Sequence, residues 1–207
     1  MACKGCGATQ QLRVWDSLNV TLDPSLKEAL LKGELHAFKC KHCGWSCHVS
    51  YPMLYHDMAK RLMIWIWSDP APPKMPILPY SGEYQLRLTA TLNELIEKVR
   101  IFDGGLDDRA MELTKCALVI QSLRSGTPLT EKLLFSGVRR DAKGEFMAVF
   151  EHLKKAGSGC AVVPMESYEG MKRALSKAFG SADPDRRKWI RTDVNYITAL
   201  LQRLPRT

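Results

Sequence analysis

The chain has 207 residues, of which 45% are hydrophobic and 25% are charged, a composition typical of a folded globular protein that excludes a largely disordered chain. The formal net charge is +8, and the basic excess lies at the two ends, because residues 80–167 carry 12 basic and 12 acidic side chains. The seven cysteines are an odd number, which argues against a closed disulfide framework. No apolar run approaches the roughly 20 residues of a membrane helix, and the first residues lack the apolar stretch of a secretion signal. We therefore expect a cytoplasmic protein with reduced thiols and no membrane contact.

Residues 1–68 predict a small β-rich domain. Partial alternation favours a strand within residues 11–20. Asp23 as N-cap, Pro24 at the first helical position and Gly33 as stop predict a short helix. Residues 35–40 and 47–52 have the composition of two hairpin arms, residues 51–57 are interpreted as a turn region, and residues 61–67 predict a buried strand.

The segment 69–79 has five prolines in eleven residues, which excludes a helix interior or a central strand and predicts an extended linker. We place the main domain boundary there. Residues 80–207 then predict an α+β region, and the class predicted for the whole chain is α+β. Its predicted elements are a strand at 84–90, helices at 91–102 and about 106–120, a hairpin from 132–138 and 145–153, and C-terminal helices at 168–179 and about 184–204.

Four cysteines form two copies of the pattern Cys-x-x-Cys-Gly, separated by 33 residues. Each copy places two sulfurs on one tight loop, and two such loops supply the four thiolates of a tetrahedral zinc site. Gly7 and Gly44 permit the sharp turn, often through positive φ, that follows each pair. The predicted ligands of one structural Zn²⁺ are Cys3, Cys6, Cys40 and Cys43. Lys4, Lys39 and Lys41 lie where they partly offset the net charge of −2 on such a site.

Two other chemistries compete with a structural metal. A catalytic zinc keeps an open position and three protein ligands, and Cys47, His42 and His48 are the alternative donors nearby. A thioredoxin-like redox role for either cysteine pair is the second alternative. Two matched pairs with flanking glycines favour the closed, structural site.

Three stretches beyond the cysteines extend the pattern: "DSLN", "KGEL" and "YPMLYHD". Together with the two cysteine motifs they make residues 2–120 resemble the bacterial CpXC domain, named for two Cys-Pro-x-Cys motifs. The resemblance implies a zinc-ribbon-like, metal-binding fold and no defined activity. Lys4 and Lys41 stand where the family name expects proline, but neither position is a ligand.

Three further groups have a structural interpretation beside a functional one. His56 is either an acid–base group or a hydrogen-bonded residue of a turn. Asp103, Asp107 and Asp108 are either cation ligands or parts of a helix junction. Trp65 and Trp67 share one face of their strand and either pack in the core or form a partner-binding patch. In each case the structural interpretation is favoured.

The sequence of the predicted last helix indicates a basic surface with one aromatic residue. Such a cluster is either a solvated basic face, which is the favoured interpretation, or a site for an anionic partner, which is nucleic-acid phosphate or an acidic protein surface. We find no nucleophile–base pair, phosphate loop or cofactor fingerprint, and we expect no enzyme activity. The expected function is a zinc-containing protein-interaction module of the adaptor or inhibitor and immunity type, and the alternative is a nucleic-acid-binding zinc-ribbon protein that uses the basic C-terminal helix. The candidate partner-binding residues are Arg186, Arg187, Lys188, Trp189 and Arg191.

Overall fold

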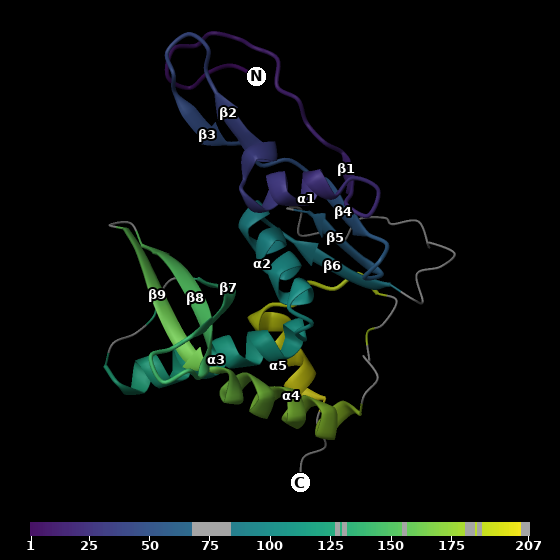
Figure 1. The fold of residues 1–207 in the computed structure, drawn as a ribbon, viewed down its shortest axis with the longest axis vertical. Coiled ribbons are helices and arrows are strands. Elements are labelled where there is room, and N and C mark those ends of the chain that lie inside the picture. The colour runs from purple at the N-terminus through teal and green to yellow at the C-terminus, as the bar shows by residue number, and fades with distance from the viewer. Residues whose placement is uncertain are drawn as a thin grey trace. The chain divides into compact units, whose positions relative to one another are not determined.

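The computed structural model describes residues 1–67, 84–126, 129, 132–154, 157–180, 185 and 188–203. It contains both helices and strands and divides into two compact units, Met1–Ile96 and Glu97–Thr207 (Figure 1). The predicted α+β class is confirmed. The predicted linker at 69–79 lies outside the described residues, and the division between the units falls downstream of it, inside helix α2 (Leu92–Asp103).

A four-stranded sheet forms the base of the first unit. Its order is β1 (Ser17–Asn19), β4 (Met53–Asp57), β5 (Leu62–Ile66) and β6 (Gln85–Thr89). The outer strands β1 and β6 pair in parallel with β4 and β5, which are antiparallel to each other. The strand that follows the proline-rich segment therefore belongs with the first unit.

Strand β4 corrects the interpretation of residues 51–57 as a turn region. Its side chains alternate between buried and half-buried positions, and it pairs with strands on both sides. The polar pair His56 and Asp57 and the preceding Pro52 resemble turn residues in sequence, but the two neighbouring strands supply the hydrogen bonds that make this segment a strand.

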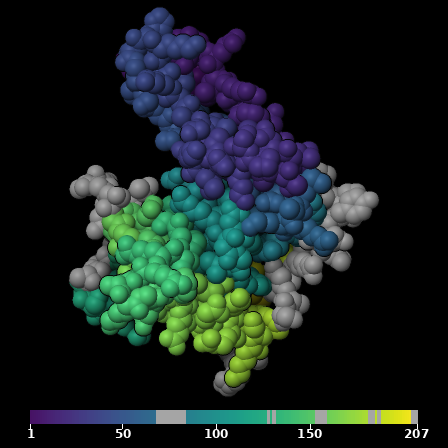
Figure 2. All heavy atoms as spheres, in the orientation of Figure 1, coloured from purple at the N-terminus to yellow at the C-terminus, as the bar shows by residue number. Residues whose placement is uncertain are grey.

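The rest of the first unit is helix α1 (Pro24–Leu31), the 3₁₀ turn η1 (Glu34–His36) and a hairpin of β2 (Ala37–Lys39) and β3 (Ser46–His48). Asp23 caps α1 by accepting a hydrogen bond from the Ser25 N–H, and Gly33 follows with a φ of 75°, as predicted. The predicted hairpin is confirmed, with β2 antiparallel to β3. Residues 1–12 and 37–49 together form what we call the cysteine lobe, a narrow projection of the first unit in Figure 2.

The second unit packs helices against a three-stranded antiparallel sheet (Figure 1). The sheet order is β7 (Leu133–Arg140), β8 (Phe146–Lys154) and β9 (Gly157–Pro164). Helix α3 (Asp108–Arg124) contacts α4 (Met165–Phe179) and α5 (Val194–Gln202), and α4 contacts β8 and β9. The predicted hairpin is thus present, and β9 is a third strand that was not predicted from the sequence. The core includes Ile101, Met111, Phe135, Phe150, Tyr168 and Ile197.

The last helix begins later than the predicted start near residue 184. Asp193 caps it by accepting a hydrogen bond from the Tyr196 N–H at 2.9 Å, so α5 starts at Val194. Lys188, Trp189 and Arg191 therefore precede the helix and do not occupy its first turns. None of the helices in the described ranges is long and apolar enough to cross a membrane.

Candidate metal centre

The two Cys-x-x-Cys loops have the same backbone geometry. In the first loop, the N–H of Gly7 donates to the carbonyl of Cys3, and the N–H of Cys3 donates to the carbonyl of Ala8. In the second, Gly44 donates to Cys40, and Cys40 donates to Trp45. Gly7 and Gly44 have φ values of 75° and 74°, in the left-handed region that only glycine adopts without strain. The repeated sequence therefore encodes a repeated loop.

The four sulfurs of these loops meet in one cluster. The Sγ atoms of Cys3 and Cys43 are 3.7 Å apart, as are those of Cys6 and Cys40, and all four lie within 4.8 Å of one another. A disulfide requires a separation near 2.05 Å, so these cysteines are unlinked thiols. A tetrahedral zinc ion with Zn–S bonds of about 2.3 Å places its sulfurs about 3.8 Å apart. The cluster therefore fits a tetrahedral metal ion.

A small apolar core supports one side of the cluster. Cys3 and Cys40 are buried with Phe38, whose ring meets that of Trp45 edge to face at 6.1 Å. A Cβ added to Gly5 would lie 3.1 Å from the Cβ of Trp45 and 3.4 Å from the Sγ of Cys43, so the first loop is packed closely against the second. Cys6 and Cys43 are exposed and form the outer side of the site.

Gln10 joins the two loops, a role that was not among the predictions from the sequence. Its side-chain amide donates to the carbonyl of Lys39 and accepts from the N–H of Lys41, both at 3.0 Å. These two bonds hold the segment after the first loop against the backbone on both sides of Cys40. No local pattern around Gln10 signals this role, because both partners are about 30 residues away in sequence.

The thiols of the cluster ionise unequally. Hydrogen bonding from the Cys43 backbone is the largest influence on Cys40 and, with that from His42, outweighs burial and lowers the pKa of Cys40 to about 6. The backbone at Ala8 favours the thiolate of Cys6, but the side chain of Cys43, burial and the other cysteines outweigh it and raise the pKa of Cys6 to about 12. Without a cation, four adjacent sulfurs cannot all hold negative charge. A bound metal ion would remove that restriction and release protons as it binds.

Most of the other candidate residues contact neighbouring side chains. The His56 ring Nε2 lies 3.2 Å from the Tyr84 hydroxyl. Asp107 caps α3 and pairs with Arg109, while Asp108 lies buried beside Lys98 at 3.4 Å. The rings of Trp65 and Trp67 meet edge to face at 5.4 Å. Among the described residues, the cysteine cluster is the one group of three or more potential metal ligands, and it contains no histidine and excludes Cys47.

The predicted partner-binding residues are only partly described. Lys188 is exposed and pairs with the buried Asp185 at 3.2 Å, and Arg203 pairs with the same carboxylate at 3.3 Å. Burial disfavours the charge of Asp185, but the Tyr196 hydroxyl, Lys188 and Arg203 lower its pKa. Trp189 and Arg191 are half-buried. Arg186 and Arg187 lie outside the described residues.

The fold and the four-sulfur cluster define a metal-binding protein module. The model of the family described as CpXC protein matches residues 1–115, and the chain belongs to this family. The match confirms the resemblance carried by the cysteine motifs and by the stretches beyond them. Neither a search of curated proteins nor a search of solved structures finds a match.

Proposed function

We propose that this protein is a non-catalytic, zinc-containing interaction module, in which one structural Zn²⁺ holds the cysteine lobe as a rigid surface for a protein partner. The observation that carries the proposal is the set of four sulfurs, two pairs of which are 3.7 Å apart and all of which lie within 4.8 Å of one another. Four protein ligands complete the coordination of zinc and leave no position for a substrate or an activated water. The metal site therefore supports stability and shape rather than catalysis.

The exposed end of the lobe is the surface that zinc would order. Cys6 and Cys43 are exposed there, and the intervening residues Lys4, Lys41 and His42 are exposed as well. The adjoining strands β2 and β3 have three residues each, so they contribute few hydrogen bonds to lobe stability. Most of the ordering of this end would come from the metal. The partner, either the target protein of an adaptor or a toxin, would then recognise a surface that exists only in the zinc-loaded protein.

Metal analysis tests the structural basis of the proposal. We expect one zinc per chain in the wild type and less than a tenth of that after Cys40→Ser. Cys47→Ser is the matched control, because Cys47 is in the same hairpin but outside the cluster, and its zinc content should equal that of the wild type. Cobalt substitution should give a tetrahedral thiolate spectrum that does not change when imidazole or azide is added. A spectrum that responds to these ligands would indicate an open position and contradict a structural site.

A crosslinking experiment tests the partner. A photo-crosslinking residue at His42 should capture one defined protein in native cells, whereas the same residue at the exposed Arg139 should not. The captured protein, once purified, should bind the wild type and should bind Cys40→Ser at least tenfold more weakly. If the crosslinking residue captures the same proteins at position 42 as at position 139, the lobe is not the interaction surface.

Nucleic-acid binding is the alternative outcome, and the ion pair of Lys188 with Asp185 gives it less support. It predicts affinity for a duplex that falls steeply with salt, with a smaller salt slope after Lys188→Gln combined with Arg191→Gln. Such a result, without a protein partner, would replace the proposal.

A further inference from the structure

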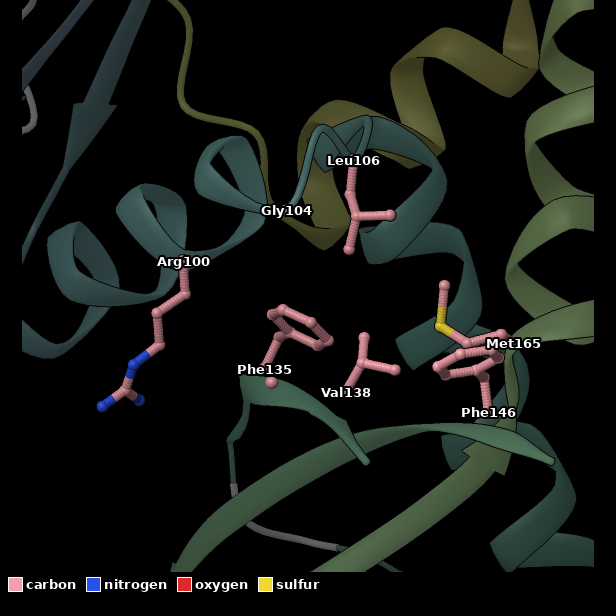
Figure 3. Close-up of a pocket in the computed structure, with 8 residues that line it drawn as sticks. Arg100, Gly104, Leu106, Phe135, Val138, Phe146 and Met165 are labelled. Atoms are coloured by element: carbon pink, nitrogen blue, oxygen red, sulfur yellow. The ribbon is translucent and has the colours of Figure 1, made fainter. Parts of the chain in front are cut away.

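The second unit contains a pocket that the metal site does not involve. Its volume is about 410 Å³, within the range of small-molecule sites. Figure 3 shows Arg100 and Phe135 toward one end, Phe146 and Met165 toward the other, and Val138 and Leu106 between them. These residues come from α2, the α2–α3 connection, β7, β8 and the start of α4. The walls are thus built from elements that are distant in sequence but anchored in one core.

Two glycines help to leave the space open. The pairing of β7 with β8 shifts register between Phe135 and Gly137, and Gly137, which lines the pocket, has no side chain to fill it. A Cβ added to Gly137 would meet no heavy atom within 4 Å. Gly104 lines the pocket where α2 ends. The irregularity in β7 is of the kind that bends a strand at ligand sites.

Two of the apolar side chains around the space are open to solvent. Phe146 is 53% exposed and Val138 is 45% exposed, although both line the pocket. An apolar ligand that covered them would remove this surface from water and gain stability in proportion to the area buried.

Among the described residues, the pocket lining includes one charged side chain and no carboxylate. Arg100 is half-buried at one end, and within the described part of the chain its guanidinium has no ion pair. Arg140, by contrast, stacks over the ring of Phe146 at 4.5 Å. A guanidinium presents paired N–H donors that match the two oxygens of a carboxylate.

We propose that this pocket binds a small organic carboxylate with an aliphatic or aromatic body, whose carboxylate pairs with Arg100 and whose body lies against Phe135, Val138 and Phe146. Charge complementarity selects the anionic end, because the described lining residues offer a cation and no competing anion. The apolar walls select the body. The proposal is independent of the zinc site, so it stands or falls separately from the proposed function.

Binding of decanoate and decanol to the full-length, zinc-loaded chain tests the proposal, with both ligands kept below the concentrations at which they aggregate. Titration followed by backbone NMR should show saturable shifts confined to the pocket. We expect decanoate to bind about tenfold or more tightly than decanol, because only the carboxylate can pair with Arg100. Arg100→Gln should remove that preference and leave the affinity for decanol unchanged.

Two further variants separate the pocket from other effects. Val138→Phe places a larger side chain at an exposed, pocket-lining position, and it should weaken both ligands tenfold or more while the protein stays folded. Arg139→Gln makes the same charge change as Arg100→Gln, but at the exposed position next to Val138. It should change neither the affinity for decanoate nor the affinity for decanol.

Three results would overturn the proposal. The first is equal affinity for decanoate and decanol, which would indicate a purely apolar occupant. The second is a preference for decanoate that survives Arg100→Gln. The third is a concentration-dependent dimer that Val138→Phe abolishes and decanoate does not dissociate, which would make a second copy of the chain the occupant.

Discussion

At the scale of single residues, the cysteine lobe depends on positions that are not ligands. Gly7 and Gly44 allow the loops to turn, and Gly5 leaves room for Trp45 to pack between the loops. Gln10 adds the cross-link between backbone segments on either side of Cys40. The affinity of the site for metal should therefore depend on how well these residues preorganise the sulfurs, and not on the sulfurs alone.

Gln10→Ala removes two hydrogen bonds to the backbone of Lys39 and Lys41 without touching a sulfur. At about 1 kcal/mol for each bond, about 2 kcal/mol in all, we expect zinc affinity to fall by roughly thirtyfold. Competition against a coloured chelator would measure the change. The exposed neighbour offers a matched control, Gln11→Ala, which should bind zinc like the wild type. Equal affinities for the two variants would show that Gln10 does not preorganise the site.

At the scale of secondary-structure elements, a group of buried charges joins α2, α3, β7 and the segment before α5. Lys98 lies between Asp108 and Glu112 and donates to the carbonyl of Thr192 at 3.0 Å. Lys115 pairs with Glu97 and Glu112 at 2.9 Å and 2.6 Å. Burial disfavours the charge of Lys115, but Glu97 and Glu112 outweigh it and raise the pKa of Lys115. These buried ion pairs therefore hold the four elements together.

Lys98→Met leaves Asp108 and Glu112 without one of their cations inside the core. Breaking a buried pair in this way should lower the free energy of unfolding by roughly 3–5 kcal/mol. Urea unfolding followed by circular dichroism would measure it. Lys188→Met, which removes an ammonium that is 69% exposed, is the control and should cost about 1 kcal/mol or less. Similar values for the two variants would contradict a stabilising role for the buried group.

The junction between α1 and the hairpin contains a histidine that predicts acid sensitivity. His36 is fully buried, its ring nitrogens have no hydrogen-bond partner among the described residues, and it stacks on Tyr51 at 4.5 Å. Burial, followed by the nearby His48, lowers the pKa of His36. A histidine with a lowered folded-state pKa contributes stability that is present above its unfolded pKa of about 6.5 and is lost as the pH falls below that value.

His36→Phe keeps the stacked ring and removes the titrating group. The loss of stability between pH 7.5 and pH 5.5 should therefore be smaller in this variant than in the wild type, as measured by chemical unfolding with zinc present. His42→Phe changes an exposed histidine next to the cluster and should keep the wild-type slope. If His36→Phe shows the full wild-type slope, another group is responsible for the acid sensitivity.

At the scale of the whole molecule, the metal site belongs to one of two compact units. The cysteine cluster lies in Met1–Ile96, whereas the apolar core of Ile101, Met111, Phe135, Phe150 and Tyr168 lies in Glu97–Thr207. The first unit contains the four-stranded sheet and the β2–β3 hairpin, and the second contains the three-stranded sheet. Metal binding should therefore stabilise the first unit directly and leave the second unit largely unaffected.

Removal of zinc should separate the melting transitions of the two units in a calorimetric experiment. At free zinc a thousandfold above the dissociation constant, binding contributes about 4 kcal/mol, and its loss should lower one melting transition by roughly 16 °C or more. The other transition should stay where it is. Cys40→Ser, measured without chelator, should reproduce the chelated profile. A single transition that moves as a whole would show that the chain unfolds as one cooperative unit.

The sequence by itself determined the local features of this protein. Cap residues located α1, hydrophobic patterns located β5, β6, α2 and the β7–β8 hairpin, and the repeated cysteine spacing identified the four sulfurs that meet. These features could be predicted because their physical cause, a turn, a cap or a periodic apolar face, lies within a few residues of the chain.

Only the tertiary structure decided the features that depend on distant partners. Strand β4 needed β1 and β5 on its two sides, and α5 was shortened by the cap at Asp193. The link from Gln10 to the second loop joins residues about 30 positions apart, and the bond from Lys98 to Thr192 spans 94 positions. The pocket beside Arg100 likewise exists only after α2, β7, β8 and α4 have packed together. Hydrogen bonds and burial across such separations depend on the folded chain, so no local pattern of residues could specify them.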